Sequence, residues 1–214
     1  MAAPIIPLPF GQDATDNGVL GSTITQDFGE GVREPIDLTG SDGDLGSTND
    51  HGKIDPNHFI DRYFYYAIDF GLDVGTKVLA EGSGHVVGTS QNDVVDNTLG
   101  PSPYLGNYIT ISYDDGIFAT YIHLEDGSIP QALLDTPSAQ VSVGQEIGDV
   151  GLTGATGGHH LHVTYGAQLV TTTSGVTMAD GSLAGNPLGV PVAFKTGQLS
   201  DGTVVWGPVW ARDC

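Results

Sequence analysis

Short apolar runs rich in β-branched and aromatic residues follow one another along the chain from residue 63 onward. Such residues favour strands, and no stretch of useful length shows the 3.6-residue periodicity of an amphipathic helix. We therefore predict strands in these runs. They lie at 63–70, 76–80, 84–88, 107–113, 117–124, 141–143, 146–151, 161–165, 190–194 and 203–206.

Turn residues separate these runs, since the chain has 32 Gly and 12 Pro. Asp115-Gly116 lies between the runs 107–113 and 117–124, and an Asp-Gly pair supplies the positive φ of a tight hairpin. One short helix is predicted at 128–135, with Ser128 as N-cap and Pro130 in its first turn. The expected fold class is all-β, with antiparallel strands, long loops and few or no helices.

The composition divides the chain into parts. Residues 1–57 are rich in Gly, Asp, Thr and Pro, and 38–50 offers almost nothing apolar to bury, so this segment is expected to be loop-rich. A length of 214 residues suits one domain with additions at its ends. Residues 169–214 are expected to form a C-terminal β extension packed on the core.

Charge excludes some partners. The chain has 6 Lys and Arg against 26 Asp and Glu, a net charge of -20, so it repels phosphate backbones and nucleic acid is excluded as a partner. No apolar run approaches the roughly 18 to 20 residues of a membrane span, and no signal peptide is visible at Met1. The single Cys214 permits neither an intramolecular disulfide nor a cysteine metal site, so any metal must be held by His and carboxylate.

Three of the seven histidines lie in the segment 158–163. In a strand His160 and His162 point to the same face while Leu161 points to the core, which suits a metal ligand beside a proton-transfer group. A His-x-His pattern alone is equally compatible with a surface or core position. Its context here is Asp69 and His123 in two other predicted strands.

In this context the chain resembles the lysostaphin and LytM-type zinc metallopeptidases, which cleave peptidoglycan peptides. The resemblance implies a LytM-like β-sheet or sandwich core over residues 58–168, one Zn²⁺ per chain, a monomer, and a secreted or periplasmic protein that acts on peptidoglycan peptides. The matching segments are 67–80, 84–87, 105–111, 120–124, 143–148, 151–154 and 160–162.

The resemblance also implies roles for single residues. Asp69 and His162 correspond to zinc ligands, and His123 and His160 correspond to the groups that handle protons and stabilise the transition state beside the zinc-bound water. Zinc favours imidazole nitrogen and carboxylate oxygen, and neutral imidazoles transfer protons near neutral pH.

The third ligand departs from the family pattern. Many relatives carry a His four residues before the Asp, and this chain has Tyr65 there. His58 is the preferred replacement, His51 comes behind it, and loss of the metal site is the third possibility.

Two residues are predicted to bind substrate. Tyr121 lies two residues before His123, so strict alternation places it on the same face, where it either lines the cleft or packs. His159 points away from His160 and either contacts substrate or covers the edge of the core.

Three functions follow in order of preference. The first is a zinc metalloendopeptidase that hydrolyses peptidoglycan peptides. The second is a catalytically inactive LytM-like module that binds the wall or regulates a wall amidase, and Tyr65 supports it. The third is a sugar-binding or structural β-domain with incidental histidines.

Overall fold

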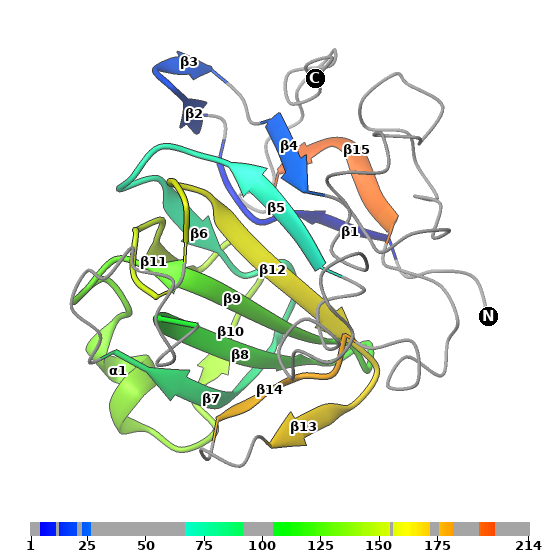
Figure 1. Ribbon diagram of the computed structural model, residues 1–214. Helices are drawn as coiled ribbons and strands as arrows, with labels where there is room; N and C mark the ends of the chain where they lie inside the picture. The colour runs from blue at the N-terminus through cyan, green and yellow to red at the C-terminus, as the bar shows by residue number, and fades with distance from the viewer. Residues whose placement is uncertain are drawn as a thin grey trace, which may run out of the picture.

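The computed structural model describes residues 5–11, 13–20, 23–26, 67–91, 105–154, 156–171, 176–181 and 193–199. A seven-stranded antiparallel sheet forms its centre, in the order β10-β7-β8-β9-β12-β5-β4 (Figure 1). The strands are β4 (Thr23–Gln26), β5 (Ala67–Gly71), β7 (Gly84–Ser90), β8 (Asn107–Tyr113), β9 (Phe118–Leu124), β10 (Gln140–Val141) and β12 (Leu161–Gly166).

Within the described ranges, four two-stranded sheets accompany the central sheet. Three are antiparallel, and the sheet of β1 and β15 is parallel. Their strands are β6 (Lys77–Leu79) with β11 (Glu146–Asp149), β13 (Leu169–Thr171) with β14 (Thr177–Ala179), β2 (Thr15–Asp16) with β3 (Val19–Leu20), and β1 (Ile5–Leu8) with β15 (Ala193–Leu199).

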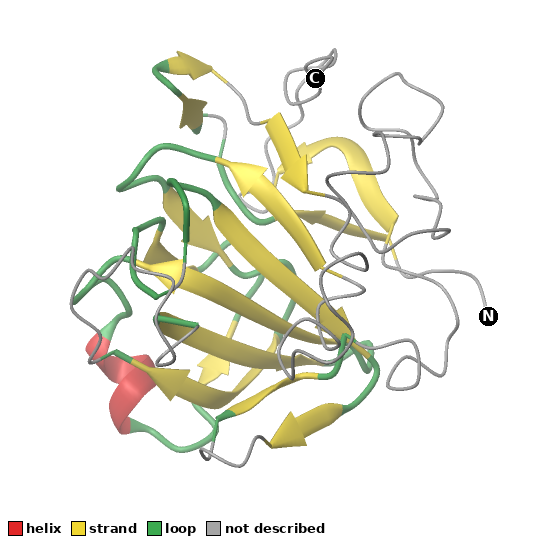
Figure 2. Ribbon diagram, in the orientation of Figure 1, coloured by secondary structure: helices red, strands yellow, loops and turns green. Residues whose placement is uncertain are grey.

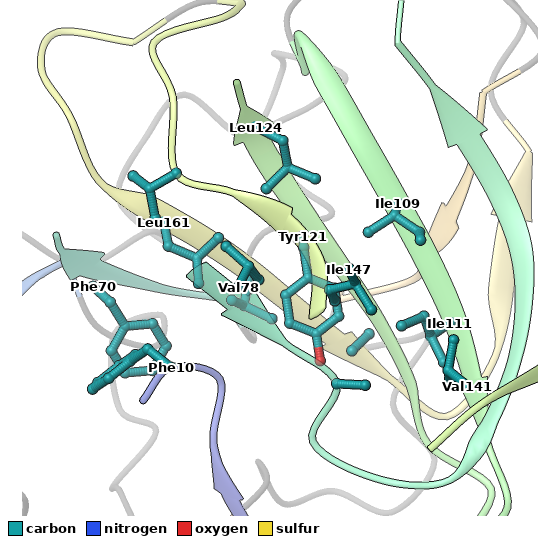
Figure 3. Close-up of a cluster of buried hydrophobic side chains, with 14 of the residues drawn as sticks. Phe10, Phe70, Val78, Ile109, Ile111, Tyr121, Leu124, Val141, Ile147 and Leu161 are labelled. Carbon is teal, nitrogen blue, oxygen red and sulfur yellow. The ribbon is translucent and has the colours of Figure 1, made fainter. Parts of the chain in front are cut away.

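The two faces of the central sheet bury different clusters. On one face Ile109 and Tyr121 pack with Val78 of β6 and Ile147 of β11 in the main apolar core (Figure 3). On the other face Ile122 packs with a smaller cluster that includes Met178 of β14. Each fully buried aliphatic or aromatic side chain contributes about 1.5–3 kcal/mol, so the sheet is stabilised from both sides.

The predicted fold class is confirmed. Among the described residues the only helix is α1 (Gln131–Asp135), drawn red in Figure 2. This part of the chain therefore offers no helix with the length and apolar character that crossing a bilayer requires.

The predicted hairpin is also confirmed. Strands β8 and β9 pair antiparallel across the turn, and Gly116 adopts φ 88°. Of the predicted strand at 190–194, the described part lies in β15, which extends from Ala193 to Leu199. Residues 63–66, 190–192 and 203–206 lie outside the described residues.

The helix cap was predicted wrongly. Pro130, not Ser128, is the N-cap of α1, and no side chain caps the helix. The Ser128 hydroxyl instead accepts a hydrogen bond from the backbone N–H of Asp149 at 3.0 Å. Ser128 thus ties the loop before the helix to β11.

The N-terminal segment contains more strand than predicted, because β1 to β4 lie within residues 5–26. Short strands of this kind are stabilised by backbone pairing with a neighbouring strand more than by an apolar pattern of their own. The neighbour of β4 is β5. The Asp73 carboxylate holds the turn between β2 and β3, accepting hydrogen bonds from Thr15 Oγ1 and from the backbone N–H groups of Asn17 and Gly18 at 2.7–2.8 Å. These bonds, chiefly that of Thr15, lower the pKa of Asp73.

Candidate metal and catalytic site

Asp69 and His162 lie opposite each other on the neighbouring strands β5 and β12. The register brings Asp69 Oδ1 to 2.8 Å from His162 Nδ1. Both residues are 4% exposed. The two residues expected to share a metal ion therefore meet in a buried position of the central sheet.

His160 completes a group of three possible ligands. Its Nε2 lies 3.6 Å from Asp69 Oδ2, and one ligand atom from each of Asp69, His160 and His162 falls within 4.8 Å of the others. Leu161, between the two histidines, is fully buried in the main core. The predicted alternation of this segment is confirmed.

His123 reaches the same site through a β-bulge in β9. The register passes from Tyr108 opposite Ile122 to Asn107 opposite Leu124, so His123 is the extra residue, and its φ is 65°. Positive φ is uncommon for residues other than glycine, and a bulge redirects the side chain. The His123 ring consequently lies with its centroid 4.9 Å from that of His160 and 6.1 Å from that of His162.

The same bulge explains why the predicted position of Tyr121 in the cleft was wrong. Strict alternation placed Tyr121 on the face of His123, but Tyr121 is fully buried in the main core and its hydroxyl bonds to Glu81 and Tyr113. Tyr121 does not line a cleft, and the packing alternative holds. Nothing in the sequence signalled the bulge.

Backbone carbonyls determine which ring nitrogens of the two flanking histidines carry protons. His123 Nδ1 lies 2.7 Å from the Thr153 carbonyl oxygen, and His160 Nδ1 lies 3.0 Å from that of Gly158. A carbonyl only accepts hydrogen bonds, so Nδ1 is the donor in each ring, and Nε2 keeps its lone pair whenever the ring is neutral. Burial, together with the neighbouring His160 and His162, lowers the pKa of His123 to about 3, so its ring is neutral at neutral pH.

Close backbone packing holds the carbonyl that orients His123. Thr153 Oγ1 donates to the Leu124 carbonyl at 2.7 Å and accepts from the Asn107 N–H at 2.9 Å. Gly106 passes so near that a Cβ there would lie 2.3 Å from the Thr153 carbonyl carbon, and its φ is 59°. Only glycine suits this position, because a side chain would push Thr153 away.

A second group of possible ligands, formed by Asp16, Asp73 and His159, lies beside the loop after β5. The Asp73 oxygens already accept the hydrogen bonds of the β2–β3 turn, and His159 Nδ1 donates to the Leu72 carbonyl at 2.9 Å. These contacts join the N-terminal hairpin to the segment that carries His160. The His159 side chain is 34% exposed, and its contact with substrate stays a prediction.

The donor set fits zinc. An imidazole and a carboxylate are ligands that zinc prefers. Asp69 Oδ1 and His162 Nδ1 lie 2.8 Å apart, close enough for one ion to bind both. The positions that bear on a third ligand, His58, His51 and Tyr65, lie outside the described residues.

Several known proteins are similar to this chain. Peptidoglycan DD-endopeptidase ShyA of Vibrio cholerae is 35% identical over 94 residues, which are 44% of this chain and 18% of that protein, so the chain spans less than a fifth of this relative's length. A zinc-containing peptidase from Vibrio cholerae is 23% identical, with a TM-score of 0.43 over 76% of this chain and 37% of that one. The catalytic domain of lysostaphin from Staphylococcus simulans is 26% identical, with a TM-score of 0.38 over 53% and 74%.

The family itself is shown by a sequence model. The model of peptidase family M23 matches residues 63–172, just over half of the 214 residues and the stretch that carries Asp69, His123, His160 and His162. This match confirms the predicted resemblance to lysostaphin and LytM-type peptidases. The chain belongs to peptidase family M23.

Proposed function

We propose that this chain is a zinc-dependent endopeptidase that hydrolyses peptide bonds in bacterial cell-wall peptidoglycan. The observation that carries the proposal is the meeting of Asp69 and His162 at 2.8 Å, with His160 and His123 beside them. The family match and the wall-cutting activity named for the Vibrio cholerae relative support the same substrate class.

Asp69 Oδ1 and His162 Nδ1 would hold the zinc ion, with His58 as the preferred third ligand and His51 as the next. The bound ion would supply Lewis-acid chemistry: polarisation of the scissile carbonyl and a water whose pKa would be lowered to about 7. Both named ligands are buried, which strengthens their attraction for the cation.

The flanking histidines handle the proton. His160 Nε2 takes up the proton released by the attacking water and returns it to the leaving amine, and the Asp69 carboxylate at 3.6 Å stabilises the imidazolium between these steps. His123 stays neutral, and its Nε2 accepts a hydrogen bond that orients the water. The carbonyls of Thr153 and Gly158 keep both rings in the required tautomer.

Substrate and location follow from the same proposal. Peptidoglycan peptides lie outside the cytoplasm, so the protein works as a secreted or periplasmic enzyme, as a monomer. The net charge of -20 disfavours nucleic acid as a partner.

One observation favours a second candidate, a catalytically inactive module that binds the wall or regulates an amidase. Tyr65 occupies the position at which many relatives carry a zinc-binding His. Without a replacement ligand the site would bind zinc weakly.

The test is digestion of purified peptidoglycan sacculi, with the released muropeptides identified by mass spectrometry. Zinc-loaded wild-type protein is expected to release peptides with new amino termini, and His162→Ala is expected to lose at least about 10³-fold in rate, because both the cation and its water are lost. His85→Ala, on β7 and separated from β12 by two strands, is the matched control and should cleave normally. Zinc-loaded wild type that cleaves no wall would favour the inactive module, and cleavage by His162→Ala at the wild-type rate would reject the proposed site.

A further inference from the structure

Thr164 lies two residues after His162 on β12, on the same face of the sheet. Its neighbours across the strands are Ala67 on β5 and Thr120 on β9. The Thr164 side chain is fully buried, and its Oγ1 lies 2.9 Å from His162 Nε2. The hydroxyl therefore contacts the ring nitrogen of His162 that faces away from Asp69.

Both ring nitrogens of His162 thus have fixed partners, and the partners differ in chemistry. Asp69, 2.8 Å from Nδ1, is a carboxylate and only accepts hydrogen bonds. Thr164, at Nε2, has a hydroxyl that both donates and accepts. A neutral imidazole has a single N–H. The group beside Nε2 must therefore accept a hydrogen bond when Nε2 carries the proton and donate one when Nε2 lacks it.

Asp69 Oδ1 lies 2.8 Å from Nδ1, where one cation can bind both atoms. A cation shared with Asp69 needs the Nδ1 lone pair, so the proton must sit on Nε2, where it donates to Thr164 Oγ1. Without a cation the hydroxyl keeps its contact with Nε2 whether or not Nε2 carries the proton, because a hydroxyl can either donate or accept.

We propose that Thr164 is a positioning residue for the metal site, whose hydroxyl orients the His162 ring and accepts the Nε2 proton when Nδ1 binds the cation. This inference rests on the proposed zinc-dependent function. Partners of metal-bound histidines typically contribute about 10–100-fold to metal affinity. The effect on zinc binding should therefore be large although Thr164 touches neither the cation nor the substrate.

The experiment measures the zinc dissociation constant of the full chain by competition with a chromophoric chelator. Thr164→Val keeps the shape and removes the hydroxyl, and Thr164→Ser restores it. Thr120→Val is the matched control, because Thr120 is a fully buried threonine opposite Thr164 whose hydroxyl bonds to Thr110 and to the Ala179 N–H instead of His162.

Thr164→Val should weaken zinc binding about 10–100-fold, while Thr164→Ser stays close to wild type. Thr120→Val should lower the melting temperature without changing zinc affinity. Unchanged affinity in Thr164→Val, or an equal loss in Thr120→Val, would overturn the positioning role while leaving the proposed function intact. Wild-type protein that binds no zinc would overturn both.

A readout independent of affinity comes from ¹⁵N imidazole NMR. Zinc-bound wild-type protein should carry the His162 proton on Nε2, hydrogen-bonded to Thr164. Zinc-bound protein in which Nε2 carries no proton would contradict the role of Thr164.

Discussion

Replacing Glu81 with glutamine is expected to remove a large part of the dependence of stability on pH. Glu81 is 2% exposed and extends a carboxyl group into the core. Oε2 accepts a hydrogen bond from the Tyr121 hydroxyl at 2.6 Å, and Oε1 accepts one from Tyr165 at 2.9 Å. Figure 3 shows the Tyr121 hydroxyl among apolar side chains. The carboxyl thus has polar partners but no solvent.

The magnitude follows from the pKa. Burial raises the pKa of Glu81 from 4.5 to about 8, against the opposing effect of the two tyrosine hydrogen bonds. The folded state therefore binds the Glu81 proton more tightly than the unfolded chain does. This contribution to stability is fully present below pH 4.5 and is lost as the pH rises to about 8. A rise of about 3.5 pKa units corresponds to about 5 kcal/mol over the whole range.

The assay is urea unfolding of metal-free protein at pH 5, 7 and 9, comparing wild type with Glu81→Gln. Glutamine keeps an acceptor for the tyrosines and does not titrate, so the stability of the variant relative to wild type should rise by about 4 kcal/mol from pH 5 to pH 9. Glu125→Gln, at an exposed position, controls for the lost negative charge. A difference in the free energy of unfolding between Glu81→Gln and wild type that stays constant with pH would contradict the raised pKa of Glu81.

Two further substitutions test how the site and its surroundings are held. Gly106→Ala should lower the free energy of unfolding by at least about 2 kcal/mol, because alanine is strained at positive φ and its Cβ meets Thr153. Peptidase activity should fall further than the loss of thermal stability predicts, because the Thr153 carbonyl orients His123. Wild-type kinetics in a folded Gly106→Ala would contradict this. Asp73→Asn should loosen the β2–β3 hairpin by about 1–3 kcal/mol, seen as faster hydrogen exchange at residues 15–20. Unchanged exchange there would rule out the anchoring role.

Local patterns predicted the parts of the fold that depend on neighbouring residues. Asp115-Gly116 marked the hairpin because positive φ is a local requirement, and β8 and β9 pair across it. The alternation of His160, Leu161 and His162 predicted two rings on one side and a buried leucine between them. The hairpin needed only the turn pair, and the alternation needed only the two-residue period of a strand.

Features set by contacts distant in the sequence escaped prediction. The side on which His123 lies depends on a bulge where β9 meets β8 and on the Thr153 carbonyl, so simple alternation misplaced Tyr121. The sequence does not mark Glu81 as a buried carboxyl, because its hydrogen-bond partners Tyr121 and Tyr165 lie on distant strands. The short strand β4 pairs with β5, although its sequence has no apolar pattern that predicts a strand.

The proposed function depends on Asp69 and His162 binding one zinc ion together. Crystals of the full chain grown with zinc, measured at the zinc absorption edge, test this directly. One anomalous peak is expected, about 2.0–2.2 Å from Asp69 Oδ1 and from His162 Nδ1. No peak at these atoms, or zinc bound only at the group of Asp16, Asp73 and His159, would contradict it.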